Sequence, residues 1–259
     1  MPSRSSSALR LEIEHALERS FPAALTPAQR TIRETASTGI AEVDELLEGG
    51  LPAGAISEIL GPESSGRTTL ALSFVAQRTA AGQVCAWVDA DDAFDPESAA
   101  ANGIHLPQLL WVRCRKPGTL TRQRPSAKPF AQLDQALRAT DLLLQAGGFA
   151  AIILDLGDTA FEHARRIPLA TWFRFRQAAD RARTSLVVVA EAGCAQSSAA
   201  VALECAALRP LIAGDAVLRG FQFQVNRERQ RFTPFAVNPK KPPARVWPAT
   251  GAWDTEQSA

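Results

Sequence analysis

A glycine-rich segment that joins an apolar run to a helical one is the residue pattern in this chain best suited to chemistry. It covers residues 61–69 and reads Gly-Pro-Glu-Ser-Ser-Gly-Arg-Thr-Thr. Two glycines let the backbone wrap closely, so that N–H groups face the oxygens of a phosphate. The helix start that follows adds partial positive charge. The pattern predicts a phosphate-binding loop, and the alternative is a glycine-rich turn that binds no ligand.

The residue types in this loop suggest separate roles for its members. The hydroxyl of Thr68 is placed to ligate Mg²⁺, and Thr69 can hydrogen-bond to phosphate. The usual pattern has Lys where this chain has Arg67, so a bulkier planar fork replaces a compact ammonium group. We expect the positive charge to be kept and the fit to phosphate to change. The predicted phosphate-binding residues are Gly61, Glu63, Ser64, Ser65, Gly66, Arg67, Thr68 and Thr69.

A second candidate for the same site is the carboxylate of Asp155. It follows the apolar run Ile152-Ile153-Leu154, which is typical of a strand buried on both faces. In proteins with phosphate-binding loops, such an Asp holds Mg²⁺ directly or through water. The alternative is an Asp that caps a helix or a turn. Taken together with the loop, Asp155 and Thr68 predict a metal site beside a bound ATP.

The elements that must position these residues alternate between strands and helices. This alternation predicts an α/β core with a mostly parallel sheet flanked by helices and joined by right-handed crossovers. The predicted strands cover residues 55–60, 84–89, 109–114, 150–154, 186–189 and 221–225, with a further one around 232–237. The predicted helices cover residues 68–79, 130–145 and 168–184.

Shifts in composition divide the chain into three parts. Residues 1–37 are predicted to form a short N-terminal helix and a linker, because apolar residues recur at helical spacing over residues 9–21. Residues 38–239 form the predicted core. Residues 240–259 are predicted to be a Pro-rich C-terminal tail, with Trp247 and Trp253 as candidate anchors.

The overall composition excludes several classes of protein. The 259 residues are 46% hydrophobic and carry a net charge of +1, so contact with nucleic acid would need a local basic patch. The four cysteines form no C-x-x-C pair and join no His cluster, which argues against a zinc site and favours reduced thiols. We find no apolar run long enough to span a bilayer and no apolar core of a signal peptide. We therefore expect a cytoplasmic protein without a membrane partner.

Basic residues gather in three places that are candidates for contact with the phosphates or bases of nucleic acid or of a bound nucleotide. Arg174 and Arg176 lie among aromatic residues that can stack on bases, and the alternative is that these aromatics are core. For the other two groups the alternatives are a solvated loop and the polar face of an edge strand. These groups are Arg113, Arg115, Lys116, Arg122, Arg124 and Lys128, and then Arg227, Arg229 and Arg231.

Residues 38–111 resemble the RecA recombinase family. The segment 61–70 matches the RecA loop everywhere except at Arg67, and Cys-Ala-Trp-Val-Asp-Ala-Asp-Asp-Ala-Phe-Asp-Pro at 85–96 is similar to the strand and turn that follow. The lead-in Gly-Gly-Leu-Pro at 49–52 is shared among RecA and its relatives. The resemblance implies a RecA-like core that binds ATP and Mg²⁺, associates with itself through a RecA-type interface, and contacts single-stranded DNA. It also implies that Arg227, preceded by Asn226, is the best match to the cations that reach across this interface to the γ-phosphate on a neighbouring copy.

Two departures from the RecA pattern bear on catalysis. The resemblance implies a catalytic Glu where this chain has Asp91, which is one methylene shorter, so that the attacking water would be misplaced. It also implies a Gln that senses the γ-phosphate where this chain has Glu191, whose carboxylate would repel phosphate unless protonated or metal-bound. Asp91 and Glu191 are the candidate catalytic positions, and together with Arg67 they predict weak or no ATP hydrolysis.

The segments that correspond to the RecA DNA-binding loops are short, and we expect no counterpart of the RecA C-terminal domain. This architecture resembles the ImuA group, RecA-related accessory proteins of bacterial damage-induced mutagenesis that work with a polymerase-like partner. The division inhibitors of the SulA type fit less well, because they typically lack an intact phosphate loop. The resemblance implies an accessory factor of DNA repair or translesion mutagenesis in the SOS response. Two alternatives stay open: a DNA-dependent ATPase that forms filaments on single-stranded DNA, and a nucleotide-free interaction scaffold.

Overall fold

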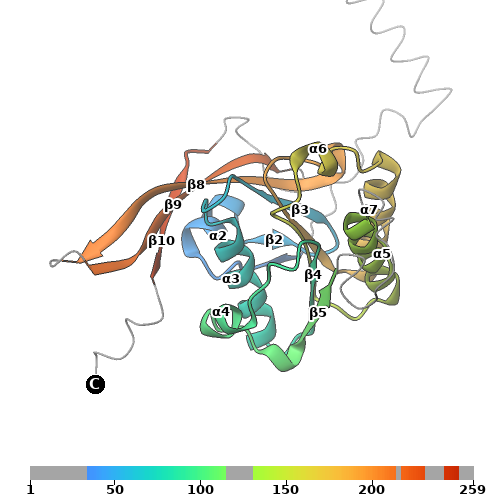
Figure 1. The fold of residues 1–259 in the computed structure, drawn as a ribbon, viewed down its shortest axis with the longest axis horizontal. Coiled ribbons are helices and arrows are strands. Elements are labelled where there is room, and N and C mark those ends of the chain that lie inside the picture. The colour runs from blue at the N-terminus through green and yellow to red at the C-terminus, as the bar shows by residue number, and fades with distance from the viewer. Residues whose placement is uncertain (1–33, 115–130, 214–216, 231–241, 251–259) are drawn as a thin grey trace, which may run out of the picture. The chain divides into compact units, whose positions relative to one another are not determined.

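Strands alternate with helices through the middle of the chain in the computed structural model, which describes residues 34–114, 131–213, 217–230 and 242–250 (Figure 1). The strands are β1 (Thr35–Ala36), β2 (Leu51–Pro52), β3 (Ile56–Leu60), β4 (Cys85–Asp89), β5 (Leu109–Arg113), β6 (Ala151–Leu156), β7 (Ser185–Ala190), β8 (Ala199–Ala213), β9 (Val217–Gln230) and β10 (Arg245–Thr250). The α-helices are α2 (Ala41–Leu47), α3 (Arg67–Ala80), α4 (Pro96–Ala101), α5 (Ala131–Ala146), α6 (Phe161–Ala164) and α7 (Leu169–Ala182), and short 3₁₀ turns cover Leu106–Gln108 and Gln196–Ser198. The helix predicted over residues 9–21 lies outside the described residues.

One large sheet forms the centre, with the strand order β10-β9-β8-β3-β7-β6-β4-β5. Neighbouring strands from β8 to β5 are parallel, whereas β9 and β10 continue the sheet in antiparallel fashion. The predicted α/β class with a mostly parallel sheet is therefore confirmed. Because parallel strands end at the same edge of a sheet, the loops that follow β3, β4, β6 and β7 meet at one edge.

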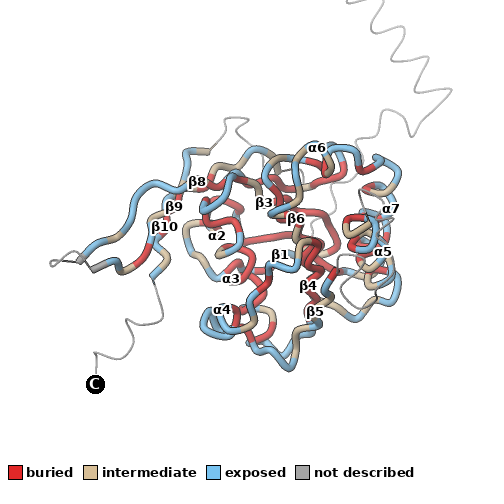
Figure 2. Tube along the Cα trace, viewed as in Figure 1, coloured by how far each residue is buried: buried red, intermediate tan, exposed pale blue. Residues whose placement is uncertain are grey.

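Helices cover both faces of this sheet, as Figures 1 and 2 show. On one face, Phe74 of α3 and Trp87 of β4 belong to a core cluster that α2 and α4 also join. On the other face, Trp172 and Phe175 of α7 pack in a second cluster with residues of α5 and the central strands. The strands between the two clusters are buried on both sides, which explains why the sequence shows them as continuous apolar runs. Within the described ranges, no helix combines the length and hydropathy needed to cross a bilayer.

The hairpin of β8 and β9 is much longer than the strand predicted over residues 221–225. Its pairing register shifts at three places, between Ala202 and Leu203, between Ala207 and Arg209, and between Leu211 and Ile212. At each shift the side chains that face the core fall out of strict alternation with those that face solvent. The sequence therefore lacks the two-residue period of apolar residues by which a strand is predicted. The strand predicted around residues 232–237 lies outside the described residues.

The C-terminal part of the sheet differs from the predicted tail. Residues 245–250 form β10 instead, which pairs with β9 so that Trp247 lies opposite Phe223. Trp247 is 2% exposed, and its ring centroid lies 5.3 Å from that of Phe223. The prolines suggested a tail, but an edge strand tolerates a residue such as Pro248 where no ladder hydrogen bond is needed. Trp247 anchors this segment, as the sequence suggested, and Trp253 lies outside the described residues.

Truncation of Trp247 tests whether β10 belongs to the core. We expect Trp247→Ala to lower the free energy of unfolding by about 3–5 kcal/mol, because a large buried side chain leaves a cavity. Val246 on the same strand is 36% exposed, and we expect Val246→Ala to cost less than about 1 kcal/mol. Urea unfolding of both variants measures the difference, and equal effects of the two substitutions would contradict this description of β10.

Candidate functional site

The glycine-rich loop connects β3 to α3, as its sequence context predicted. Gly61 and Gly66 have φ angles of 152° and 88°, and Ser64 between them also has a positive φ of 60°. A Cβ on Gly61 would lie 2.5 Å from the carbonyl oxygen of Cys205, and one on Gly66 would lie 2.6 Å from the ring of Phe223. Both glycines are therefore required by positive φ and by close neighbours, which fixes the loop tightly against β8 and β9.

The loop has the features that a phosphate group needs. The N-terminus of α3 has no side-chain cap and no acidic residue in its first turn, so backbone N–H groups there point toward the loop without a carboxylate partner. Ser65 is 1% exposed, and its hydroxyl has no hydrogen-bond partner among the described residues. A cavity of about 390 Å³ is lined by residues 63–69 together with Asp158, Phe221 and Phe223. The donors and the space fit the phosphate chain of a nucleotide.

Arg67, the residue that departs from the usual loop pattern, is 6% exposed and turned onto backbone carbonyl groups. Its Nη1 donates to the carbonyl oxygen of Gly61, and its Nη2 donates to that of Gly157 at 2.6 Å. Nη2 also lies 3.9 Å from Oδ1 of Asp158. The guanidinium thus ties the start of the phosphate loop to the segment that follows β6, where a Lys would reach toward the β- and γ-phosphates.

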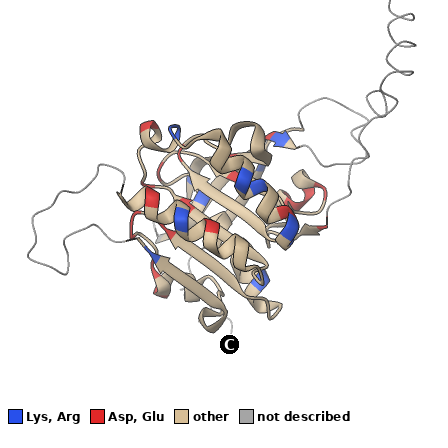
Figure 3. Ribbon diagram, turned by 90° about the vertical axis from the view of Figure 1, so that its right-hand side faces the viewer, with Lys and Arg blue, Asp and Glu red and all other residues tan. Residues whose placement is uncertain are grey.

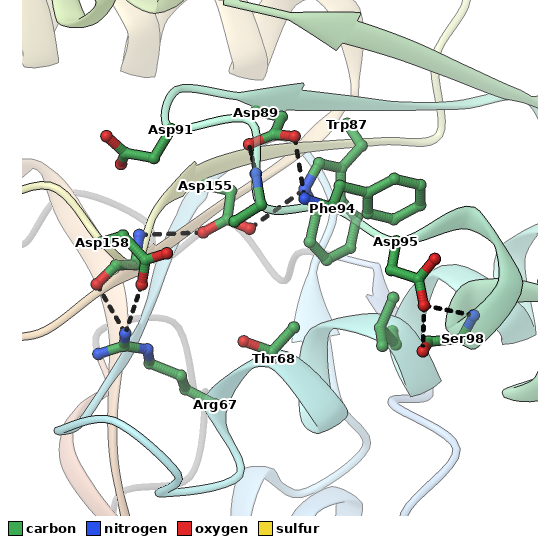
Figure 4. Close-up of a pocket in the computed structure, with 13 residues that line it drawn as sticks. Arg67, Thr68, Trp87, Asp89, Asp91, Phe94, Asp95, Ser98, Asp155 and Asp158 are labelled. Atoms are coloured by element: carbon green, nitrogen blue, oxygen red, sulfur yellow. Dashed lines mark hydrogen bonds and ion pairs between the residues drawn. The ribbon is translucent and has the colours of Figure 1, made fainter.

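A second cavity of about 340 Å³ adjoins the loop and is lined by Arg67, Thr68, Asp91 and Asp155, among others (Figure 4). Thr68 is exposed at the first turn of α3, and Asp155 lies near the end of β6. The structure therefore brings together the two predicted metal ligands on one cavity. Mg²⁺ is commonly held by one or two protein oxygens with substrate phosphates and water, so a hydroxyl and a carboxylate suit it.

The carboxyl group of Asp155 has an unusual environment for an acid. One oxygen accepts hydrogen bonds from the backbone N–H of Gly157 at 3.0 Å, and the other accepts from Nε1 of Trp87 at 3.2 Å. Burial raises its pKa to about 6, the negative charge of Asp89 adds to this, and the two hydrogen bonds oppose it. At neutral pH the group is ionised at a free-energy cost, and a cation in the cavity would relieve that cost.

The two predicted catalytic residues lie in different surroundings. Asp91 lines the same cavity as Thr68, and its Oδ2 accepts a hydrogen bond from the hydroxyl of Thr159 at 2.6 Å. Glu191 follows β7 and is exposed beside another cavity of about 340 Å³, which Glu63, Arg67 and Thr159 also line. Asp91 and Glu191 therefore line different cavities among those formed by the described residues.

Several residues that line these cavities carry no signal in the sequence that would mark them as part of a site. Asp158 and Thr159 belong to the turn after β6. No sequence motif marks them, and their link to the site comes from the contact of Asp158 with Arg67 and the hydrogen bond from Thr159 to Asp91. Phe221 and Phe223 lie on the same face of β9 and line the cavity beside the loop, which depends on a strand register that the sequence does not show. Asp89 has a structural role, because its carboxylate accepts from the N–H groups of residues 93 and 94 and from Nε1 of Trp111.

The described basic candidates are engaged within the chain. Arg113 forms a two-pronged ion pair with Asp92, at 2.6 Å and 2.8 Å, and its guanidinium lies 4.6 Å from the centroid of Trp111. Arg227 donates to the carbonyl oxygen of Leu46 at 3.0 Å, at the end of α2, and Arg229 donates to the carbonyl oxygen of Gln196. The candidates Arg115, Lys116, Arg122, Arg124, Lys128 and Arg231 lie outside the described residues.

The aromatic residues around Arg174 and Arg176 divide between core and surface. Trp172 and Phe175 are fully buried, as the alternative interpretation held, whereas Phe173 is 48% exposed. Arg174 pairs with Asp141 of α5 at 3.1 Å, and Arg176 lies over the ring of Phe173. Figure 3 faces the side formed by α5 and α7 and shows basic and acidic residues mixed on it. Among the residues that the structure describes, this face carries no concentration of positive charge of the kind that DNA binding needs.

Comparison with known proteins agrees with the fold and with the loop. Residues 7–160 match the model of the RecA N-terminal domain. The chain belongs to this family. It is 43% identical over 120 residues to protein RecA of Pseudomonas fluorescens strain Pf-5, an alignment that covers 46% of the chain. It is 42% identical over 123 residues to protein RecA of Allorhizobium ampelinum, which covers 47% of the chain.

The alignments with these two RecA proteins cover only part of this chain and part of each relative. The matched region spans 30% of the length of both RecA relatives. The match to the RecA N-terminal domain includes the phosphate loop, Asp91 and Asp155, while β7 to β10 lie beyond it. The family membership therefore supports the core and its loop, and the activity of this chain has to be argued from its own residues.

Replacement of Arg67 by Lys tests the carbonyl contacts. We expect Arg67→Lys to lower the free energy of unfolding of the ligand-free protein by about 1–3 kcal/mol, because one ammonium group cannot replace both hydrogen bonds of the buried fork. The same variant should gain more thermal stability than the wild type on addition of Mg-ATP. Differential scanning fluorimetry measures both, with Arg78→Lys at the other end of α3 as a control. An unchanged melting temperature of ligand-free Arg67→Lys would contradict the proposed tie.

The raised pKa of Asp155 predicts a pH-dependent stability. Because the folded-state pKa of about 6 exceeds the ordinary value of 3.8, the proton-linked stabilisation is complete below pH 3.8 and is lost as pH rises through about 6. Asn at position 155 cannot ionise. As pH rises from 4 to 6.5, the free energy of unfolding of Asp155→Asn should therefore rise relative to that of the wild type by on the order of 2 kcal/mol. Above pH 6.5 this difference should change little. Chemical unfolding from pH 4.5 to 8 measures this. A difference that does not vary with pH would show that Asp155 is not strained by burial.

Proposed function

We propose that this chain binds ATP with Mg²⁺ at residues 61–69 and hydrolyses it weakly or not at all. The observation that carries the proposal is the position of Arg67, whose guanidinium is bound to carbonyl oxygens on both sides of the loop rather than projecting freely toward a phosphate. Thr68 and Asp155 would hold the metal ion, which would neutralise phosphate charge in an otherwise acidic cavity. The backbone N–H groups at the start of α3 would hold the phosphate chain.

Binding and catalysis place different demands on Arg67. Arg67 cannot bind a phosphate chain and keep its hydrogen bonds to the carbonyl groups of Gly61 and Gly157 at the same time. Breaking these hydrogen bonds would therefore weaken the net binding of the nucleotide. The fork geometry of Arg also differs from the compact charge that normally follows the γ-phosphate. We therefore expect modest affinity for the nucleotide and little stabilisation of the transition state.

The environment of Asp91 points in the same direction. A general base must lie within hydrogen-bonding reach of the attacking water. Here the shorter carboxylate accepts a hydrogen bond from Thr159, on the turn that Arg67 also holds through Gly157. Glu191, on another cavity, would place negative charge near Glu63 and Asp158 instead of a neutral amide. This arrangement favours a static nucleotide over rapid turnover.

The biological role that we propose is that of an accessory factor in DNA repair or translesion mutagenesis, within the damage response. Its support is the RecA family membership combined with the altered positions 67, 91 and 191. In this role the chain would act by docking partners, namely other copies of itself, a polymerase-like protein and, to a lesser extent, single-stranded DNA. The internal bonds of Arg113, Arg227 and Arg229 support a small contribution of these residues to DNA binding.

A second candidate function is a DNA-dependent ATPase that forms filaments on single-stranded DNA. The observation that favours it is that Thr68, Asp91 and Asp155 share one cavity, as an active ATP site would require. A third candidate, a nucleotide-free scaffold, would be favoured if Arg67 cannot leave the carbonyl groups of Gly61 and Gly157. These alternatives differ in turnover and in binding, and both can be measured directly.

Calorimetric titration with a slowly hydrolysed ATP analogue and Mg²⁺ separates these functions. We expect saturable binding to the wild type, at least tenfold weaker binding to Thr68→Ala because its metal ligand is lost, and near-normal binding to Thr68→Ser, which keeps the hydroxyl.

Steady-state ATP turnover with and without single-stranded DNA completes this test. The proposal predicts little turnover under either condition. Strong DNA-stimulated turnover would favour the filament-forming ATPase. Absence of binding at millimolar ligand would favour the scaffold and overturn the proposal.

A further inference from the structure

Three aromatic rings form a row beside the phosphate-binding loop. Trp247 of β10 and Phe223 of β9 lie opposite each other, with ring centroids 5.3 Å apart. Phe221 lies two residues before Phe223, hence on the same face of β9, with centroids 6.2 Å apart and ring planes 30° from parallel. The exposed fraction rises along the row from 2% at Trp247 and 6% at Phe223 to 45% at Phe221. The row thus begins in the core at Trp247 and ends at the solvent-exposed ring of Phe221.

This row is held in place by the loop itself. The ring of Phe223 lies so close to Gly66 that no Cβ would fit there, and Gly66 immediately precedes α3. The cavity of about 390 Å³ is lined on one side by residues 63–69 and on the other by Phe221 and Phe223. One cavity therefore connects the predicted phosphate site with the exposed ring, as a nucleotide with its phosphates at one end and its base at the other requires.

The other aromatic side chains on the described cavity walls are not available for stacking. Trp87 and Phe94 line the cavity beside Thr68, but they are 0% and 9% exposed and pack against each other in the core. The start of α4 contributes Asp95 and Ser98 to that wall, and these two side chains bond to each other. Among the described residues that line the loop cavities, Phe221 is the aromatic residue with a largely exposed ring.

We propose that Phe221 is the stacking platform for a purine base whose phosphates are bound by residues 61–69. Stacking of a base on an aromatic ring is favourable for every base, and purines offer the larger surface. Phe223 and Trp247 act as positioning residues, because they support the ring from the core side. This inference rests on the proposed nucleotide binding and adds to it the residue that recognises the base.

The test compares ligands with and without a base. Isothermal titration with Mg-ATP and with Mg-tripolyphosphate is performed on the wild type and on Phe221→Ala, Phe221→Tyr and Leu218→Ala. Leu218 is a matched control, since it is 42% exposed on the same strand and does not line the cavity. We expect Phe221→Ala to weaken ATP binding about tenfold, in line with the loss of one stacked base. Tripolyphosphate binding should be unchanged, and Phe221→Tyr and Leu218→Ala should bind ATP like the wild type.

The outcomes distinguish this inference from the proposed function. If the wild type binds ATP and Phe221→Ala binds it equally well, the stacking role is overturned and nucleotide binding stands. If Phe221→Ala weakens ATP and tripolyphosphate by the same factor, Phe221 shapes the loop rather than recognising a base, and the inference again fails. If the wild type binds neither ligand, the proposed function and the inference fall together.

Discussion

The contacts of one buried side chain hold together the edge of the sheet where we propose that a nucleotide binds. Arg67 stands at the first position of α3 and donates to a carbonyl at the start of the loop and to another after β6. The segment after β6 carries Asp158 and Thr159, and Thr159 in turn donates to Asp91. A single guanidinium therefore couples three loops that would have to rearrange around a nucleotide. An unpaired buried charge is costly, so this coupling persists until a ligand offers Arg67 an equivalent partner.

This coupling explains how a nearly complete phosphate loop can coexist with altered catalytic positions. The parts of the site made by backbone groups and small residues, at Gly61, Ser65 and Gly66, suit any phosphate chain. The parts that would act on the γ-phosphate depend on side chains, and there Arg67, Asp91 and Glu191 differ from the RecA pattern. In the proposed function, binding and turnover would thus rely on different residues, and the changes would affect mainly those of turnover.

The sequence predicted most of the core because its strands and helices follow simple rules. Buried parallel strands such as β6 and β7 appear as apolar runs, and the loop at 61–69 has a residue pattern with few alternative structures. The long β8–β9 hairpin escaped prediction because register shifts disturb its alternation, and β10 escaped because prolines and a short length concealed an edge strand.

The candidate site was likewise predictable only as far as its motifs extend. Residue spacing indicated Thr68 and Asp155, which the structure brings to one cavity. The direction in which Arg67 turns, and the approach of Phe221 and Phe223 to the loop, depend on contacts between segments about 90 and 155 residues apart, which local patterns do not encode. Of these long-range contacts, those of Arg67 also suggest why ATP turnover would be slow.

The most direct test of this account is a crystal structure of the protein with Mg²⁺ and a slowly hydrolysed ATP analogue. The account predicts a phosphate chain along residues 63–69, with Arg67 released from the carbonyl groups of Gly61 and Gly157 and turned toward the phosphates. A nucleotide bound in the loop while both carbonyl hydrogen bonds of Arg67 remain intact would contradict the central role given to this residue.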